Sequence, residues 1–435
     1  MSSARALIAV VVASLTCGVV SARADDHVAF LDAGSPIAAG GGKVAYSVRG
    51  DDGRFRLAVG GAAVPGLASS ATPFDVALGA DDGGTPVATY SRAHRAYVVR
   101  LSGPAAGHET PMRSISGPAV EPVVSGDAVA WIIPGKGTGP RRCDRLALRR
   151  GAGRPRIVSS ACRVLIGLAI DGVTRRIAWS SANLTGTDAH GAGRKTSSIK
   201  VAGIREQVAR TVETTSFGEE GNVLSSPSIS GGRVYYTQTG VHPRPAFVSA
   251  GVASGRPATS PAGTALAGPL AVDGADAYYL LGADDGEDCG PLVPCELVHA
   301  ATKDLAPGAA RQLPPELSVG YTPAVKPPAG TPLTVAGVLA RRTVRDGATI
   351  ATAPIAGEAV DVLSRSFPKD GTPEAFAPTS YSATTGADGA WSVQVPAPDE
   401  PFFSARVRST GLLAGRGTVG YCPAGTVSNG NGSCS

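Results

Sequence analysis

The sequence predicts an all-β protein built from two units. Three observations carry this expectation. Gly and Pro are frequent, with 57 and 34 copies in 435 residues, while 43% of residues are hydrophobic and only 17% are charged. A strand–turn–strand pattern with an aromatic residue recurs along the first two-thirds of the chain. After a proline-rich segment, the pattern changes to longer alternating strands. Such a chain can bury a core through many short strands joined by tight turns.

The recurring unit places a small or apolar strand before a glycine-containing turn, and a second strand that carries an aromatic ring. Steps of 44, 41, 48, 57 and 43 residues separate the rings of successive copies. The six ring positions are Tyr46, Tyr90, Trp131, Trp179, Tyr236 and Tyr279. Periods of this length made only of strand and turn signals are typical of propeller blades. We therefore expect a six-bladed β-propeller over residues 25–322.

Each copy continues with further strand-like segments, so four strands per blade are expected. The segment at 27–32 precedes the first blade and could pair with the last one, which would close the ring and remove a free sheet edge. The SG-x-x-VAW pattern at 125–131 and the DG-x-x-AYY pattern at 273–279 resemble TolB-type or WD-like bacterial propeller repeats. This resemblance covers about residues 27–320.

The aromatic rings have a structural and a functional interpretation. Rings that recur once per blade are expected to pack between neighbouring blades. Alternatively, the consecutive pairs Tyr235–Tyr236 and Tyr278–Tyr279 direct one ring of each pair to the opposite face of a strand, where it could stack on a sugar or a peptide. The repetition favours the structural interpretation.

Residues 323–332 form a proline-rich linker, and the alternating segments that follow predict a β-sandwich over 333–412. The run ATTGADGAWSVQVP at 383–396, with Pro354, Gly357 and Val360 before it, resembles the carboxypeptidase-regulatory-like and bacterial Ig-like domains. The resemblance implies an Ig-like β-sandwich with Trp391 in its core and no catalytic role. Residues 413–435 are expected to be a disulfide-closed or flexible tail.

The first residues predict export. An apolar run follows Arg5 and ends before the small-residue site Ala22–Arg23–Ala24, so residues 1–24 are expected to be a signal peptide and Asp25 the first residue of the mature chain. We expect a secreted protein with no transmembrane anchor. Cys17 offers the alternative of lipidation, although the residues before it match a lipoprotein signal poorly.

Six cysteines remain after residue 24, and an even number in an exported chain predicts disulfides. The disulfide candidates are Cys143, Cys162, Cys289, Cys295, Cys422 and Cys434. Fifteen pairings are formally open. The glycine turn midway between Cys143 and Cys162 favours a bridge across a hairpin, the short spacing favours Cys289 with Cys295, and the last two would close the tail. Without a C-x-x-C pair, zinc is not favoured.

The charge balance excludes some partners. The formal net charge is +5, and it falls to +3 without Arg5 and Arg23. A chain of this size with so small a charge has no signature of nucleic-acid binding. We expect a monomer whose partner is a cell-surface polysaccharide or protein.

Two common catalytic motifs are absent from the sequence. Neither G-x-S-x-G nor H-E-x-x-H occurs. The densest acidic cluster is Asp284, Asp285, Glu287 and Asp288, which could bind calcium, although solvated turns are the simpler interpretation. No other cofactor is indicated. The carboxylates that could serve acid–base chemistry near the inner strands are Asp75, Glu121, Asp127, Asp171 and Asp273. The last three occupy corresponding turns, which favours a turn-forming role.

Two functions remain open at this point. The chain could be an exported binding or scaffold protein that engages a cell-surface polymer or protein. It could instead be a propeller enzyme, of the glycoside hydrolase, lyase or lactonase type, with a carboxylate or calcium site at the channel mouth. Uncharged inner strands favour the binding protein. Polar residues that do not repeat from blade to blade, converging at one axial end, would favour an enzyme.

Overall fold

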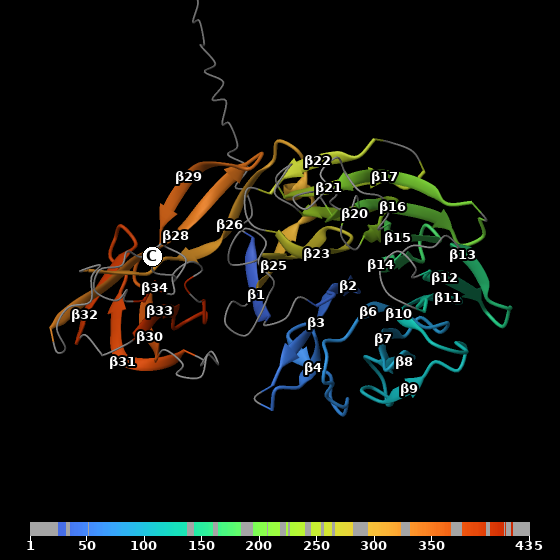
Figure 1. The fold of residues 1–435 in the computed structure, drawn as a ribbon, viewed down its shortest axis with the longest axis horizontal. Helices are drawn as coiled ribbons and strands as arrows, with labels where there is room; N and C mark the ends of the chain where they lie inside the picture. The colour runs from blue at the N-terminus through green and yellow to red at the C-terminus, as the bar shows by residue number, and fades with distance from the viewer. Residues whose placement is uncertain are drawn as a thin grey trace, which may run out of the picture.

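The computed structural model shows a protein made almost entirely of β-strands (Figure 1). It describes residues 25–31, 35–50, 52–136, 143–159, 164–183, 195–206, 208–217, 223–224, 227–239, 245–253, 256–262, 266–281, 295–322, 331–366, 376–396, 401–412, 414 and 419–420. Within these ranges, no helix is long and apolar enough to cross a membrane. The strand content of the described residues confirms the all-β fold class.

The described part of the first unit consists of six small antiparallel sheets, each mostly a meander of consecutive strands. The first three contain β2 (Ala38–Gly40), β3 (Lys43–Arg49), β4 (Phe55–Val59) and β5 (Ala62–Ala63); β6 (Ala77–Ala80), β7 (Pro86–Arg92), β8 (Arg95–Arg100) and β9 (Glu109–Pro111); and β10 (Val120–Ser125), β11 (Ala128–Ile133), β12 (Arg145–Arg150) and β13 (Arg156–Ser159).

The next three sheets complete this unit. They contain β14 (Val164–Asp171), β15 (Arg176–Asn183), β16 (Lys195–Gly203) and β17 (Arg210–Phe217); β18 (Val223–Leu224), β19 (Ser228–Ser230), β20 (Arg233–Thr239), β21 (Ala246–Gly251) and β22 (Ala258–Pro261); and β23 (Leu266–Asp273), β24 (Asp276–Leu281), β25 (Cys295–Ala301) and β1 (Asp26–Leu31). A short 3-10 helix, η2 (Thr302–Leu305), follows β25.

The six sheets close into a ring. Each neighbouring pair shares a cluster of buried apolar side chains, and the last sheet shares one with the first, where Tyr278 and Leu280 pack with Tyr46 and Val44. The N-terminal strand β1 pairs antiparallel with β25. The expected closure of the last blade by the N-terminal segment is therefore confirmed, and this edge of the ring is covered.

The second unit consists of two further antiparallel sheets. Its strands are β26 (Ala310–Leu317), β27 (Gly320–Thr322), β28 (Pro332–Arg345), β29 (Ala348–Pro354) and β32 (Ala390–Pro396) in one sheet, and β30 (Ala359–Ser366), β31 (Ala377–Thr384), β33 (Pro401–Val407) and β34 (Val419–Gly420) in the other. Side chains of both sheets form one core that includes Leu333, Val362, Trp391 and Phe403. Burial of Trp391 agrees with its expected place in this core.

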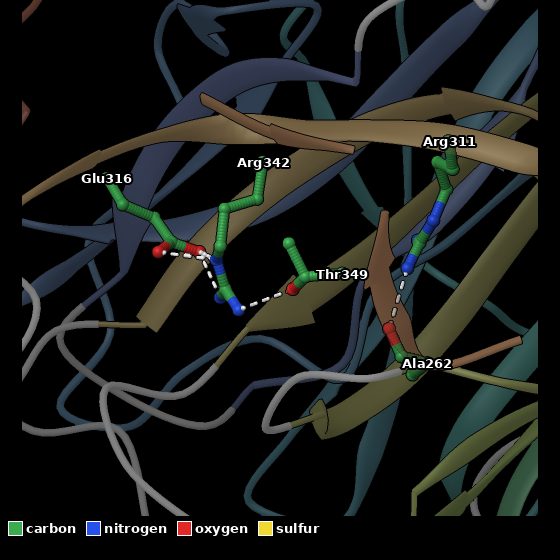
Figure 2. A network of polar contacts seen from close by, with 5 residues as sticks. All are labelled: Ala262, Arg311, Glu316, Arg342 and Thr349. Atoms are coloured by element: carbon green, nitrogen blue, oxygen red, sulfur yellow. Dashed lines mark hydrogen bonds and ion pairs between the residues drawn. The ribbon is translucent and has the colours of Figure 1, made fainter. Parts of the chain in front are cut away.

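Residues 310–322 belong by pairing to this second unit. The sequence places them at the end of the propeller, yet β26 and β27 both pair with the long strand β28. The guanidinium of Arg342 on β28 donates to the Glu316 carboxylate of β26, with Nε 2.8 Å from Oε2 (Figure 2). The outer position beside β25 that residues 309–314 would fill is already taken by β1, so this segment pairs elsewhere.

Candidate functional site

A small cavity lies where the inner strands of all six sheets meet. It has a volume of about 100 Å³. Each sheet contributes apolar residues to its wall: Ile37, Val76, Val123, Leu168, Ile229 and Leu270. Two acidic side chains, Asp75 and Glu121, also line it. We call these two residues the axial acid pair.

The axial acid pair comes from neighbouring sheets and is joined by a hydrogen bond. Asp75 precedes β6, and its Oδ2 accepts from the backbone N–H of Glu121 on β10 at 2.8 Å. The backbone N–H and the hydroxyl of Ser91, on β7, donate to the same carboxylate. Asp75 is therefore fixed by three donors, while both acids stay half-buried at the cavity. Neither side chain makes an ion pair with any residue that the structure describes.

The backbone at Glu121 adopts a conformation that side chains rarely take. Its φ is +49°, and the pairing of β10 with β11 shifts register between Val120 and Val123. The next sheet has a register shift at the matching place, between Leu165 and Leu168, and there the chain uses Gly167, with φ +103°. A left-handed conformation costs a residue with a side chain roughly 1–2 kcal/mol. This cost falls on a position that presents a carboxyl group to the cavity, and such strain is often found at functional sites.

Burial and mutual repulsion raise the pKa values of the pair. Burial and the charge of Asp75 together raise the pKa of Glu121 to about 8, although a hydrogen bond from the Gly167 backbone lowers it. Burial also raises the pKa of Asp75, against the donors that stabilise its ionised form. Asp144 adds to the negative potential at Glu121. At neutral pH, Glu121 is therefore mostly protonated.

Sequence reasoning did not single out Asp144. It lies fully buried in the connection between β11 and β12, where its Oδ1 accepts from the Gly135 N–H at 2.7 Å and its Oδ2 from the Leu165 N–H at 3.1 Å. It therefore ties this connection to β14 of the next sheet. Its position directly after Cys143 was the only available signal.

Strand direction places the ends of several second strands at the same axial end as the acid pair. In an antiparallel meander, the second strand of a sheet ends where the first strand begins. Asp75 and Glu121 lie at the beginnings of first strands. The last residues of β11, β15 and β24 therefore lie at that end of the ring.

The turn acids lie at the opposite end and are engaged by other residues. Asp171 accepts from the Thr174 hydroxyl at 2.7 Å, within its own turn, as a turn-forming role requires. Asp127 instead pairs with Arg150 at 3.0 Å, and Asp273 accepts from the backbone N–H of Gly42, in the neighbouring sheet, at 2.8 Å.

All six recurrent rings are buried: Tyr46, Tyr90, Trp131, Trp179, Tyr236 and Tyr279. In the sixth sheet, Tyr279 packs toward the fifth sheet and Tyr278 toward the first, so both rings of this consecutive pair contact neighbours. Tyr235 is half-buried beside the cluster of the fifth and sixth sheets. These positions leave little ring surface for stacking on a ligand.

The remaining sequence candidates can be placed only in part. Cys143 and Cys295 each take part in a disulfide. Their expected partners Cys162 and Cys289 lie outside the described residues, as do Cys422, Cys434 and the calcium candidates Asp284, Asp285, Glu287 and Asp288. Over the described ranges, no group of three or more His, Cys, Asp or Glu residues is arranged to hold a metal ion.

No family model matches the sequence, and no curated protein matches it either. Among solved structures, the chain is similar to a puromycin-hydrolyzing peptidase of Mycobacterium tuberculosis, with 14% identity and a TM-score of 0.40 over 75% of this chain and 56% of that one. It is also similar to TolB from Acinetobacter baumannii (13% identity, TM-score 0.33, 59% of this chain and 63% of that one).

A third similar structure is the β-propeller domain of the Trilobed protease from Pyrococcus furiosus (11% identity, TM-score 0.35, 56% of this chain and 75% of that one). The chain spans little more than half the length of the M. tuberculosis peptidase. Likenesses this distant carry no inference about activity.

Proposed function

We propose that this chain is an exported binding protein whose six-bladed propeller engages a cell-surface polymer or protein through a protruding cationic amine. The ligand would approach the axial end that carries the acid pair. The second unit would hold the propeller at a distance from its neighbours.

The observation that carries this proposal is the placement of Glu121. It occupies a strained position where the next sheet has Gly167, and it lies beside Asp75 with no cation paired to either among the described residues. A purely structural bulge would be formed more easily by glycine. A carboxyl pair held at such a cost is suited to a positively charged ligand group, which would draw both acids into their ionised form.

The size of the cavity supports a small cationic group. Pockets that enclose small-molecule substrates measure roughly 300–1,000 Å³. The axial cavity, at about 100 Å³, is smaller than this and has room for an ammonium group and a few methylenes. Apolar side chains around the acids would pack on the methylenes of a lysine-like side chain.

Binding of poly-lysine and of an amine-bearing glycan polymer to the purified mature protein tests the proposal, with the N-acetylated forms of both as controls. The amine forms should bind and the acetylated forms should not. Asp75→Asn should weaken binding at least about tenfold, in the range measured when one partner of a buried charge pair is removed. For poly-lysine, affinity should rise between pH 6 and pH 9, because Glu121 loses its proton over this range.

Asp127→Asn is the matched control, since this acid is 44% exposed at the opposite end of the propeller. If Asp75→Asn and Asp127→Asn weakened binding equally, the weakening would come from the net charge of the protein and not from the acid pair. Equal binding of the acetylated polymers would contradict the proposal directly.

The enzyme alternative rests on the same acids. A carboxyl group with a pKa near 8 beside a second carboxylate is the kind of arrangement used for general acid–base catalysis in glycoside cleavage. The axial cavity is smaller than the usual range for substrate pockets, which favours the binding function. If the protein hydrolysed or cleaved a compound from a panel of glycans and lactones, and Glu121→Gln abolished this activity, the enzyme alternative would be favoured over the binding function.

A further inference from the structure

The start of the closing strand lies in a buried polar cluster between the ring and the second unit. Asp25 is fully buried, and its Oδ2 accepts from the Tyr279 hydroxyl at 2.6 Å and lies 3.3 Å from Nη1 of Arg311. The Arg311 guanidinium also donates to the Ala262 carbonyl at 3.0 Å (Figure 2). The backbone N–H of Asp25 donates to the Gln312 carbonyl of β26 at 2.8 Å.

Two buried carboxylate oxygens have no hydrogen-bond partner in the part of the chain that the structure describes. They are Oδ1 of Asp25 and Oδ2 of Asp304, which belongs to η2. Leaving a buried charged acceptor unsatisfied is costly, so native structures rarely contain one without a reason. The orphan atom of Asp25 belongs to the residue that the sequence predicts as the first of the mature chain.

The charges at the cluster do not balance. The groups that act on the Asp25 carboxyl are the Arg311 guanidinium, the carboxylates of Asp304 and Asp26, and the Tyr279 hydroxyl. Asp26 is exposed to solvent, so two carboxyl groups with buried oxygens, those of Asp25 and Asp304, share one guanidinium. A further positive charge with hydrogen-bond donors, next to the backbone nitrogen of Asp25, would balance them.

We propose that hydrolysis of the Ala24–Asp25 peptide bond supplies this charge, and that the new α-ammonium group of Asp25 completes the buried cluster and locks the closing strand. An export peptidase would add water across the bond, leaving a carboxylate on Ala24 and an amine on Asp25 that takes up a proton. The amide has one hydrogen, already given to Gln312, whereas the ammonium has three. The additional hydrogens can satisfy the orphan oxygens.

The proposal explains why the acid is buried at this position. Burial raises the pKa of the Asp25 carboxyl to about 6, against the effect of Arg311. An adjacent ammonium would favour the ionised carboxylate. Because β1 is the strand that closes the ring, a stronger hold on Asp25 stabilises the last sheet.

Two purified forms of the protein test this inference, one starting at Asp25 and one at Ala24, each released from a fusion partner by a protease that leaves no extra residue. The Asp25 form should melt at least about 3 °C higher at pH 7, the shift expected from one or two charge-assisted hydrogen bonds. An α-amine stabilised in the folded state keeps this benefit below its unfolded pKa of about 8 and loses it as pH rises through its higher folded pKa. The difference in melting temperature should therefore disappear at high pH.

Asp25→Asn in both forms completes the comparison, because it removes the acceptor while keeping the chain lengths. The melting difference should shrink in this background. If the difference in melting temperature did not shrink, it would come from chain length and not from the Asp25 carboxylate. Equal melting temperatures of the two original forms would overturn the proposal. The proposal would also be overturned if calcium or magnesium raised the melting temperature of the Ala24 form to that of the Asp25 form, because the balancing cation would then be a metal. N-terminal sequencing of the exported protein should read Asp25 first.

Discussion

Replacing Glu121 by Gln should make the protein more stable, by an amount that depends on pH. The ordinary pKa of a glutamate is 4.5, and burial with the neighbouring acids raises that of Glu121 to about 8. This difference corresponds to a penalty of about 5 kcal/mol on the ionised form in the folded state. Gln cannot ionise, and its carbonyl oxygen can still accept from the Gly167 backbone.

The direction of the change in stability with pH depends on whether the folded or the unfolded chain binds the proton of Glu121 more tightly. Below pH 4.5 the acid is protonated in both states, and the penalty is absent. As pH rises from 4.5 to 8, the unfolded chain releases the proton and the folded chain keeps it, so the stability of the wild type falls. The advantage of Glu121→Gln should therefore grow to about 3 kcal/mol at pH 7 and about 5 kcal/mol at pH 9.

Urea unfolding of both proteins at pH 4.5, 7 and 9 measures this advantage. Glu206→Gln is the matched control, because its side chain is 50% exposed and lies away from the cavity. It should show no comparable growth with pH. Parallel stability curves for the wild type and Glu121→Gln would refute the reasoning, because they would mean that the acid ionises in the cavity as it does in water.

Three further changes test interactions that stabilise the ring of sheets. Gly79→Ala should destabilise it by several kcal/mol in urea unfolding, since the new Cβ would lie 2.0 Å from the Val124 carbonyl oxygen of the next inner strand. Tyr236→Phe should cost about 1–3 kcal/mol in the same assay, because Glu213 loses its hydroxyl donor. Reduction should lower the melting temperature through the Cys143 disulfide, worth about 3 kcal/mol for the expected loop. Six free thiols in the oxidised, denatured chain would contradict that expectation.

The parts of the fold that repeat could be read from the sequence. Buried rings recur because each blade needs one large side chain against its neighbour. The turn acids recur in corresponding turns, but Asp171 bonds within its own turn, while Asp127 and Asp273 contact residues elsewhere. The closing strand could also be anticipated, since a ring of sheets with a free edge is exposed to further pairing.

The candidate site could be predicted only in part, because it departs from the repeat. Asp75 and Glu121 were visible as acids near inner strands, but their shared hydrogen bond depends on a register shift in β10 and on a positive φ. Both arise from tertiary packing between sheets. Comparison of the blades does contain a signal, since Glu121 stands where the next copy has Gly167.

The boundary between the two units illustrates a different limit. Strand alternation in residues 310–322 is equally compatible with an outer blade strand and with a sandwich strand. Which of the two forms depends on whether another strand already covers the edge of the last blade. Because β1 already covers β25, β26 pairs with β28 instead. Local sequence contains no information about which of two distant strands reaches that edge first.

This arrangement predicts that the two units unfold together. The second unit contributes Arg311 and Gln312 from β26, which hold Asp25 at the start of the closing strand. Unfolding of β26 would leave the buried Asp25 carboxylate without its guanidinium, and breaking such a pair costs roughly 3–5 kcal/mol. Calorimetry of the mature protein should therefore show one transition. Arg311→Met, which keeps the apolar contact with Phe247 and Tyr279 but removes the charge, should separate it into two. Two transitions in the wild type would show that the units are independent and that the Asp25 cluster transmits no stability between them.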